Sequence, residues 1–161
     1  MYQFKYADKQ NIEETLPYLF DILHSNMSII TPTGNTYKND LKEWLSNIIP
    51  AMQKEPRQIV LMFADSELIG YFQYYISSDS LMMEEIQIRN DYQGTGLFNL
   101  FYSWLIEKLP KNLKQVAAYS NKNNCKSQGV LEHLGLRKTG EKSCNFFYYK
   151  GDYAVLLEKY S

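Results

Sequence analysis

A strand, a glycine turn and a helix follow one another between residues 83 and 98, and this junction constrains the fold more than any other stretch. Polar and apolar residues alternate up to Ile88, which predicts a strand with two unlike faces. The loop Gln93–Gly96 that follows contains two glycines. From Leu97 onward apolar residues recur at helical spacing, until Pro110 ends the pattern. The sequence therefore predicts a strand that enters a helix through a tight loop.

A loop of this composition favours an anion site. Glycine lets successive backbone N–H groups point the same way, and it has no Cβ to obstruct a ligand. The first turn of the next helix adds unpaired N–H groups and a partial positive charge, a combination that most often binds phosphate. No lysine follows Gly96 and the three-glycine dinucleotide fingerprint is missing, so two familiar phosphate loops are excluded. A loop that only turns the chain into a helix stays open.

A second segment, Asn124–Leu136, gives the junction a more specific interpretation. Its asparagine is followed by Ser127 three positions later and by Gly135 eleven positions later. In the first segment, Ile88 stands six positions before Gly94. The two segments resemble the acyl-CoA signature and the later motif of the GNAT superfamily of N-acetyltransferases. In that family a β-branched residue ends a strand six residues before the first glycine of an Arg/Gln-Gly-x-Gly loop.

The resemblance covers most of the chain from Leu68 onward, and it implies one GNAT-like α+β domain over residues 1–161. The length agrees, because 161 residues suffice for one domain with a full core and are too few for two ordinary domains. We expect a central mixed, mostly antiparallel sheet of about six or seven strands flanked by about four helices. The tail from Lys150 to Lys159 is similar to the closing hairpin of the family.

Hydrophobic periodicity predicts where the strands and helices lie. Three strands in series are expected to form an antiparallel meander, and the strand–helix–strand unit a right-handed parallel crossover. The expected strands are Tyr2–Tyr6 at an edge, Gln58–Ala64, Leu68–Ile76, Leu81–Arg89, Leu113–Tyr119, and a final hairpin of Asn145–Tyr149 and Tyr153–Leu157. The expected helices lie at residues 11–24, 41–50, 97–108 and 123–134.

Local signals predict the ends of the first two helices. Asn11 begins a capping-box pattern, while Pro17 favours a start nearer Thr15. His24 is expected to close the first helix, where a cation suits the helix dipole. The second helix is expected to end near Pro50.

The resemblance implies acetyl-CoA as the acyl donor and a role for each matching residue. The backbone of Ile86 and Ile88 would pair with the pantetheine arm as an added strand does, and an N–H near Ile88 would polarise the thioester carbonyl. Asn124 would contact the same arm, and Ser127 would face the cofactor from the next helix. The diphosphate would be held by Gln93, Gly94, Thr95, Gly96, Leu97 and Phe98.

A carboxylate on the predicted strand is the expected general base. Glu84 is the first candidate, because it lies four residues before Ile88 and strand periodicity puts it on the Ile86 face. Glu85 points the other way and is the second candidate. The family has a histidine or a glutamate near this position, and a water can relay the proton. For both glutamates a solvated strand face is the alternative.

Two positions depart from the family pattern. Leu131 stands where the family's usual general acid is a tyrosine, and Phe98 stands where a glycine or alanine is usual. The leaving thiolate would then take its proton from water, from Tyr119, from the ammonium product or from His133. Either Lys122 or Lys126 would meet the nucleotide phosphate unless both are simply solvated.

Composition excludes several classes of protein. With a net charge of −1, no general attraction to nucleic acid or to a membrane surface is expected. The N-terminus has no apolar signal core, and no apolar run approaches the roughly eighteen residues of a membrane span, so we expect a cytoplasmic protein. Two cysteines without metal-like spacing predict neither a disulfide framework nor a metal site.

The function that the resemblance implies is transfer of an acetyl group from acetyl-CoA to a primary amine in a direct ternary complex. The acceptor, a small molecule or a peptide, cannot be named from the sequence, and a homodimer stays open. Two other functions also stay open. One is a non-catalytic acyl-CoA-binding protein with a degenerate site, which Leu131 favours. The other is a phosphate-binding module unrelated to CoA.

Overall fold

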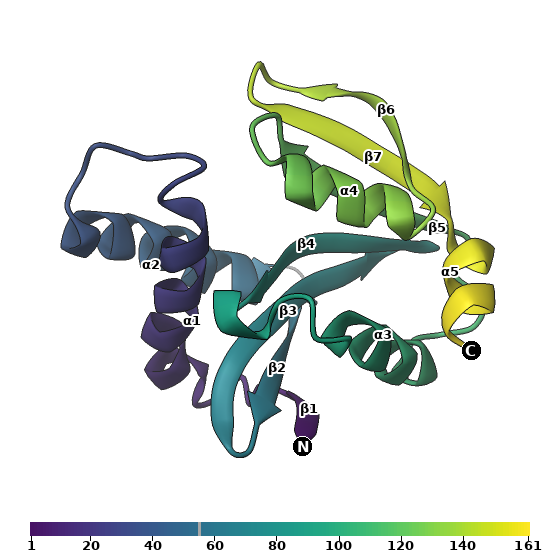
Figure 1. The fold of residues 1–161 in the computed structure, drawn as a ribbon, viewed down its shortest axis with the longest axis horizontal. Helices are drawn as coiled ribbons and strands as arrows, with labels where there is room; N and C mark the ends of the chain where they lie inside the picture. The colour runs from purple at the N-terminus through teal and green to yellow at the C-terminus, as the bar shows by residue number, and fades with distance from the viewer. Residues whose placement is uncertain (55) are drawn as a thin grey trace. The chain divides into compact units, whose positions relative to one another are not determined.

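The computed structural model describes residues 1–54 and 56–161, and these form seven strands, five α-helices and one short 3₁₀ helix. They run in the order β1 (Tyr2–Tyr6), α1 (Ile12–Met27), α2 (Tyr37–Lys54), β2 (Gln58–Ala64), β3 (Glu67–Ser77), β4 (Ser80–Ile88), η1 (Asn90–Tyr92), α3 (Leu97–Lys108), β5 (Gln115–Asn121), α4 (Cys125–His133), β6 (Arg137–Lys142), β7 (Phe146–Asp152) and α5 (Tyr153–Tyr160) (Figure 1).

The strands belong to one mixed sheet with the order β1-β2-β3-β4-β5-β7-β6. The pairs β1–β2, β5–β7 and β6–β7 are antiparallel, whereas β4 and β5 run parallel. This confirms the predicted mixed, mostly antiparallel sheet, the edge position of Tyr2–Tyr6 and the parallel pairing of the strands that flank α3. The described residues contain five α-helices where about four were expected.

Contacts divide the chain into two compact units. Unit 1 comprises Met1–Gln73 and Glu85–Thr95, and unit 2 comprises Tyr74–Glu84 and Gly96–Ser161. Strands β3 and β4 each contribute residues to both units. The single domain expected over residues 1–161 stays a prediction.

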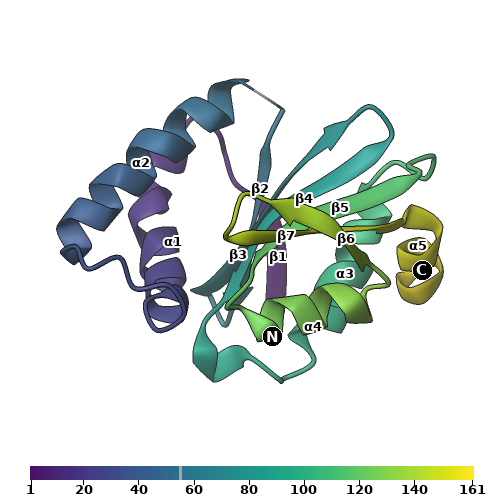
Figure 2. The ribbon, with the colours of Figure 1, turned by 90° about the horizontal axis from the view of Figure 1, so that it is seen from above.

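The core of unit 1 lies between its two helices and its strands. Helices α1 and α2 lie side by side in both views (Figures 1 and 2). Leu16 and Leu19 on α1 are buried against Ile59 on β2 and Tyr71 on β3, and Ile48 of α2 joins the same cluster. Burial of several such side chains contributes about 1.5–3 kcal/mol each, which is more than any single local helix signal.

Two predicted boundaries of α1 were wrong, and burial explains the one at its start. The helix begins at Ile12 rather than near Thr15, and it contains Pro17. Proline removes only one backbone hydrogen bond so near the start, while Ile12 and Leu16 are both buried. The helix also continues beyond His24 to Met27.

Two further local signals were overridden. The side chain of Asn11 does not cap α1, because its amide nitrogen donates to the Asp8 carboxylate at 3.0 Å. Helix α2 does not end at Pro50 but continues to Lys54. Ile48 and its neighbours on α2 pack into the unit 1 core, so tertiary packing again decides where the helix ends.

In unit 2 the helices and strands near the strand–loop–helix junction agree closely with the predicted ones. Helix α3 spans Leu97–Lys108, as predicted. Strand β4 pairs with β5 in parallel from Ser80↔Gln115 to Met83↔Ala118. Helix α4 starts after Asn124, whose side chain accepts a hydrogen bond from the Ser127 N–H at 3.0 Å.

The C-terminal prediction was wrong in its elements. The hairpin consists of β6 and β7, so it forms one element earlier than predicted, and Tyr153–Tyr160 is helix α5 instead of a strand. Every residue of β6 is exposed, so that strand carries no apolar alternation to signal it. Helix α5 buries Tyr153, Leu156 and Tyr160, which lie at helical spacing. In so short an apolar run, periodicity alone does not distinguish a helix from a strand.

The β6–β7 hairpin generates a stability prediction for two glycines. A Cβ on Gly151 would lie 2.8 Å from the Gly135 carbonyl oxygen and 3.2 Å from the Leu136 Cα, whereas a Cβ on Gly140 would meet no atom within 4 Å. Gly151→Ala should therefore lower the free energy of unfolding by about 1–3 kcal/mol. Gly140→Ala should change it by less than about 0.5 kcal/mol. Urea denaturation of both variants measures this, and equal stabilities would contradict the described approach of the two backbones.

Candidate functional site

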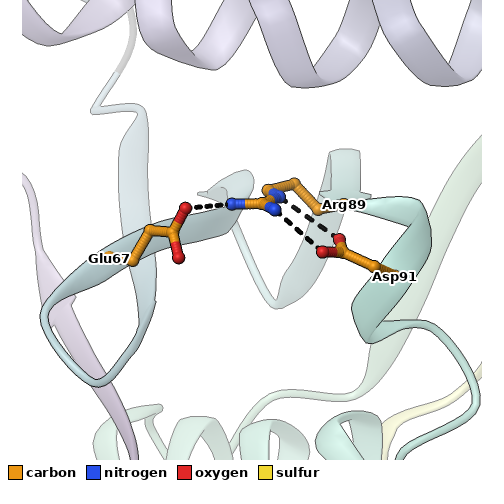
Figure 3. A network of polar contacts seen from close by, with 3 residues as sticks. All are labelled: Glu67, Arg89 and Asp91. Carbon is orange, nitrogen blue, oxygen red and sulfur yellow. Dashed lines mark hydrogen bonds and ion pairs between the residues drawn. The ribbon is translucent and has the colours of Figure 1, made fainter.

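The 3₁₀ turn that precedes the glycine loop is held by a network around Arg89 (Figure 3). Its Nε and Nη2 donate to the two carboxylate oxygens of Asp91 at 3.2 and 2.8 Å, and its Nη1 donates to Glu67 on β3. The guanidinium also lies over the Tyr92 ring, 5.5 Å from its centre. Two carboxylates thus compensate the charge of Arg89, so an anion at the adjacent loop would depend on backbone donors.

Both glycines of the loop adopt the left-handed backbone conformation that glycine tolerates. Gly94 and Gly96 have φ angles of 76° and 82°, and Gly96 is the residue before the first turn of α3. A Cβ at either position would meet no atom within 4 Å. The Thr95 hydroxyl donates to the Tyr92 carbonyl at 2.7 Å and accepts from the Tyr2 hydroxyl at 3.2 Å. The Thr95 hydroxyl thus holds the loop in place, and the space that a Cβ on Gly94 or Gly96 would occupy is open.

The backbone N–H groups of this loop have no acceptor within the described part of the protein. This holds for Gly94, Thr95, Gly96, Leu97 and Phe98. The α3 ladder starts further on, where the Leu100 N–H donates weakly to the Gly96 carbonyl at 3.5 Å. Consecutive unpaired donors at a helix N-terminus can hold a phosphate or diphosphate.

The carbonyl of Ile88 ties this region of unit 1 together. Its oxygen accepts from Asn26 Nδ2 on α1 and from Gln93 Nε2 in the loop, both at 2.9 Å. The next N–H, that of Arg89, donates to the Ile69 carbonyl on β3 at 2.8 Å. The side chain of Gln93 therefore anchors the loop to β4, a role that its place in the loop did not predict.

Glu85 belongs to a polar cluster in unit 1. Gln87, which is 7% exposed, donates from Nε2 to Glu85 Oε1, and its own Oε1 accepts from Asn26 Nδ2 at 2.9 Å. Tyr71 on β3 is 1% exposed, and its hydroxyl has no hydrogen-bond partner among the described residues. Burial, and secondarily the charge of Glu85, raise the pKa of Tyr71 well above its ordinary value, so the hydroxyl keeps its proton.

The other predicted glutamate lies in a different unit. Glu84 is the last residue of the β4 segment in unit 2, whereas Glu85 begins the β4 segment of unit 1. Sequence reasoning named both glutamates but missed Asn26, Gln87 and Tyr71. The polar position of Gln87 in the alternating strand is the one local signal for any of the three, because contacts between α1, β3 and β4 cannot be read from local spacing.

Aromatic side chains connect α1 and α2 in unit 1. Phe20 contacts His24, Tyr37 and Trp44, with ring centres 5.4–5.6 Å apart. The Tyr37 hydroxyl donates to Asp21, and this hydrogen bond raises the pKa of Tyr37 to about 12. His24 is therefore part of an aromatic contact instead of the end of a helix.

Unit 2 contributes the residues predicted on α4. Asn124 caps the helix through its Oδ1 and receives the Ser127 N–H, as described above, so both residues stand at the α4 N-terminus. Leu131 is buried, and it carries no exchangeable proton. The Tyr119 ring is 40% exposed and contacts Tyr148, with ring centres 4.8 Å apart.

A pocket of about 340 Å³ lies between α3 and α4 in unit 2. It is lined by Phe98, Asn99, Tyr102, Lys126, Gly129, Val130, His133, Leu134 and Tyr160. The Phe98 ring stacks on Tyr102 one turn along α3 (6.1 Å between centres), so this bulky side chain packs along the helix. Of the two lysines singled out in the sequence, Lys122 forms an ion pair with Glu141 at 2.9 Å, and Lys126 lines the pocket.

The described part of the chain has neither a metal-binding cluster nor a helix suited to a membrane. No three or more His, Cys, Asp or Glu side chains among these residues come together as a metal site. Within residues 1–54 and 56–161, no helix has both the length and the apolar composition needed to cross a bilayer.

No protein-family model and no curated protein matches the sequence, but solved structures match the fold. An acetyltransferase from Thermus thermophilus aligns over 94% of this chain and 97% of its own, with a TM-score of 0.72 and 17% identity. The PaiA N-acetyltransferase from Thermoplasma acidophilum, solved in complex with coenzyme A, aligns over 95% and 99%, with 0.68 and 13%. The ribosomal-protein-S18-alanine N-acetyltransferase from Escherichia coli aligns over 94% of both chains, with 0.63 and 15%. The chain therefore has the fold of the GNAT acetyltransferases.

The unpaired hydroxyl of Tyr71 leads to a prediction about stability. Tyr71→Phe keeps the ring and removes a buried polar group that has no partner, so the free energy of unfolding should stay unchanged or rise by about 1 kcal/mol. Tyr37→Phe is the matched control, because it removes a hydroxyl that does have a partner, Asp21. The control should lose stability, by less than about 1 kcal/mol at this exposed place. A loss above that size for Tyr71→Phe in urea denaturation would contradict the described burial.

Proposed function

We propose that this chain, which has the GNAT fold, transfers an acetyl group from acetyl-CoA to a primary amine by direct attack in a ternary complex. The observation that carries the proposal is the row of unpaired backbone N–H groups from Gly94 to Phe98. Coenzyme A contains a diphosphate, and these donors have the chemistry and the open space that a diphosphate needs. A neighbour in fold was solved with coenzyme A, which supports the same ligand here.

The strand before the loop supports a place for the thioester. Because the Arg89 N–H is bonded to β3, the N–H of Ile88 points to the other side of β4. The Ile88 carbonyl is held by two side-chain amides, so the orientation of the neighbouring backbone is fixed. We assign to the backbone of Ile86 and Ile88 the contacts with the pantetheine arm, and to the Ile88 N–H the polarisation of the thioester carbonyl.

Residues of unit 2 are proposed for the nucleotide end. Lys126 lines the pocket between α3 and α4, and for that position we propose it as the cation for the nucleotide phosphate. Lys122 forms an ion pair with Glu141. Asn124 and Ser127 are retained as cofactor contacts at the start of α4, where helix N–H groups gather.

For the general base we favour Glu85 over Glu84. Glu85 lies in a cluster with side chains from α1 and β3, and it keeps a hydrogen bond that stabilises a carboxylate. When bound, acetyl-CoA supplies the acetyl group as a thioester. Glu85 would first take a proton from the substrate ammonium, directly or through a water, which frees the lone pair of the amine. The amine nitrogen would then form the N–C bond to the thioester carbonyl, and the C–S bond would break to release the thiolate. Glu84 stays a candidate, and Tyr119 or water would return a proton to the thiolate because Leu131 cannot.

The acceptor is proposed only as a class. The neighbours in fold include a ribosomal-protein-S18-alanine N-acetyltransferase and a chimera of a spermidine N-acetyltransferase, so a peptide amine and a small amine both suit the proposal. We propose a cytoplasmic single-domain enzyme without a metal, without nucleic-acid or membrane partners, and with a homodimer left open.

The row of unpaired backbone N–H groups from Gly94 to Phe98 predicts how glycine variants bind coenzyme A. In Gly94→Ala and Gly96→Ala a Cβ would enter the open space and strain a left-handed residue, so the Kd for CoA should rise about tenfold or more. Gly34→Ala is the matched control, since Gly34 has a φ of 77° and equally open surroundings but lies in the loop before α2. It should carry the same strain of about 1–2 kcal/mol and leave the Kd unchanged.

Isothermal titration calorimetry of the parent and the three variants gives these values. The parent must bind CoA for the comparison to count in favour of the proposal. Equal affinities across all four proteins, or a parent without affinity, would exclude the loop as the diphosphate site.

The base assignment predicts the kinetics of two isosteric variants. Release of free thiol from acetyl-CoA is followed with a panel of amines, including spermidine, amino acids and short peptides with a free N-terminus. Glu85→Gln should lower kcat about a hundredfold or more and flatten the acid limb of its pH profile. Glu84→Gln should lower kcat less than threefold, with CoA binding kept in both. The reverse order of effects would assign the base to Glu84.

A non-catalytic acyl-CoA-binding protein is the second candidate function, and buried Leu131 at the general-acid place favours it. It predicts a CoA-dependent gain in thermal stability, about 2.7 kcal/mol at a hundred times the Kd, together with no turnover of any amine. Turnover of one amine by the parent excludes it.

A further inference from the structure

The Ile88 carbonyl determines the direction of a chain of amides in unit 1. A carbonyl oxygen only accepts, so the Asn26 atom that faces it at 2.9 Å must be the nitrogen. The same nitrogen lies 2.9 Å from one end of the Gln87 amide, which must therefore be the oxygen. Consequently the nitrogen end of Gln87 is the one that faces Glu85. The orientations of both amides follow from one backbone group without further assumptions.

This direction has a chemical consequence for Glu85. Glu85 Oε1 accepts a hydrogen bond from the N–H of Gln87, and such a bond favours the ionised carboxylate over the protonated carboxyl group. A general base must be ionised before it can accept the proton of an ammonium. The chain from Ile88 through Asn26 and Gln87 thus ends on the atom where proton transfer would occur.

We propose that Asn26 and Gln87 are positioning residues for Glu85. They keep its carboxylate ionised, and they fix its position relative to the Ile88 backbone, which would bind the thioester. The inference rests on the proposed function, because it assigns Glu85 the role of base. Asn26 lies near the end of α1, so one side chain connects that helix both to the base and to β4. A shift of this part of α1 would displace the Glu85 carboxylate and the Ile88 backbone together.

Other titratable groups around Glu85 have separate partners or a fixed charge state. On β3, Tyr71 keeps its proton through burial. Arg89, which follows β4, is paired with Glu67 and Asp91, and His24 on α1 stacks with Phe20. On α2, the charged side chains of Lys38, Lys42 and Glu43 are exposed.

The first test removes the donor to Glu85 without changing the length of the side chain. In Gln87→Met, the titration midpoint of the Glu85 carboxyl, followed by ¹³C NMR and assigned with Glu85→Gln, should move to higher pH by on the order of one unit. The acid limb of kcat/KM should move by the same amount, while KM for acetyl-CoA stays constant. Gln115→Met, at an exposed place on β5, is the matched control and should move neither.

The second test asks whether the two amides act as one chain. Asn26→Leu should move the Glu85 midpoint in the same direction, because Gln87 loses the partner that orients it. In the double variant with Gln87→Met, the Asn26 change should add nothing further. Additive shifts, or an unmoved midpoint in Gln87→Met, would overturn the proposal. Asn26→Ser replaces Asn26→Leu if the latter does not fold, and Asn39→Leu on the exposed start of α2 is its control.

These readouts separate the inference from the proposed function. The NMR titration needs no turnover. If the parent protein has no acetyltransferase activity, the proposed function is excluded. The titration midpoints of Glu85 still show in that case whether the two amides act on its carboxylate. A midpoint that moves while the acid limb of an active enzyme does not would remove Glu85 from the reaction, and with it the positioning role.

Discussion

The carbonyl oxygen of Ile88 is the acceptor on which the arrangement in unit 1 depends. Two side-chain amides donate to it, one from α1 and one from the glycine loop, and both contacts are 2.9 Å long. A carbonyl has two lone pairs, so both are satisfied and the end of β4 has one fixed orientation. Within unit 1, the Gln93 side chain attaches the start of the following loop to this strand end, and Asn26 connects the same carbonyl to Gln87 and so to Glu85. The Arg89 network secures the turn on the other side of the same residue.

The proposed recognition of the diphosphate by backbone donors would place few demands on the sequence. The three solved structures named above are only 13–17% identical to this chain, yet they align over nearly its whole length. A row of N–H groups requires glycines at the positions with positive φ and a helix behind them, and it asks little of the side chains. Here those requirements fall on Gly94 and Gly96, with φ angles of 76° and 82°.

How much could be predicted from the sequence depends on where the determining contacts lie. The strand–loop–helix junction is local, so β4, the loop and α3 were found with small errors at their ends. The continuations of α1 through Pro17 and of α2 through Pro50 depend on burial in the core, and local signals gave the wrong boundaries. Strand β6 is exposed throughout and carried no pattern at all. Asn26 and Gln87 meet across 61 positions of the sequence, so no spacing rule could join them.

The central claim is that the N–H groups from Gly94 to Phe98 bind the diphosphate of coenzyme A. The most direct measurement is a ¹⁵N-labelled titration of these five amides with coenzyme A and, in parallel, with pantetheine, which has no diphosphate. The account predicts that coenzyme A shifts the amide signals of residues 94–98 strongly, while pantetheine at the same concentration leaves them in place. Signals that stay unmoved at saturating coenzyme A, or that respond equally to both compounds, would contradict it.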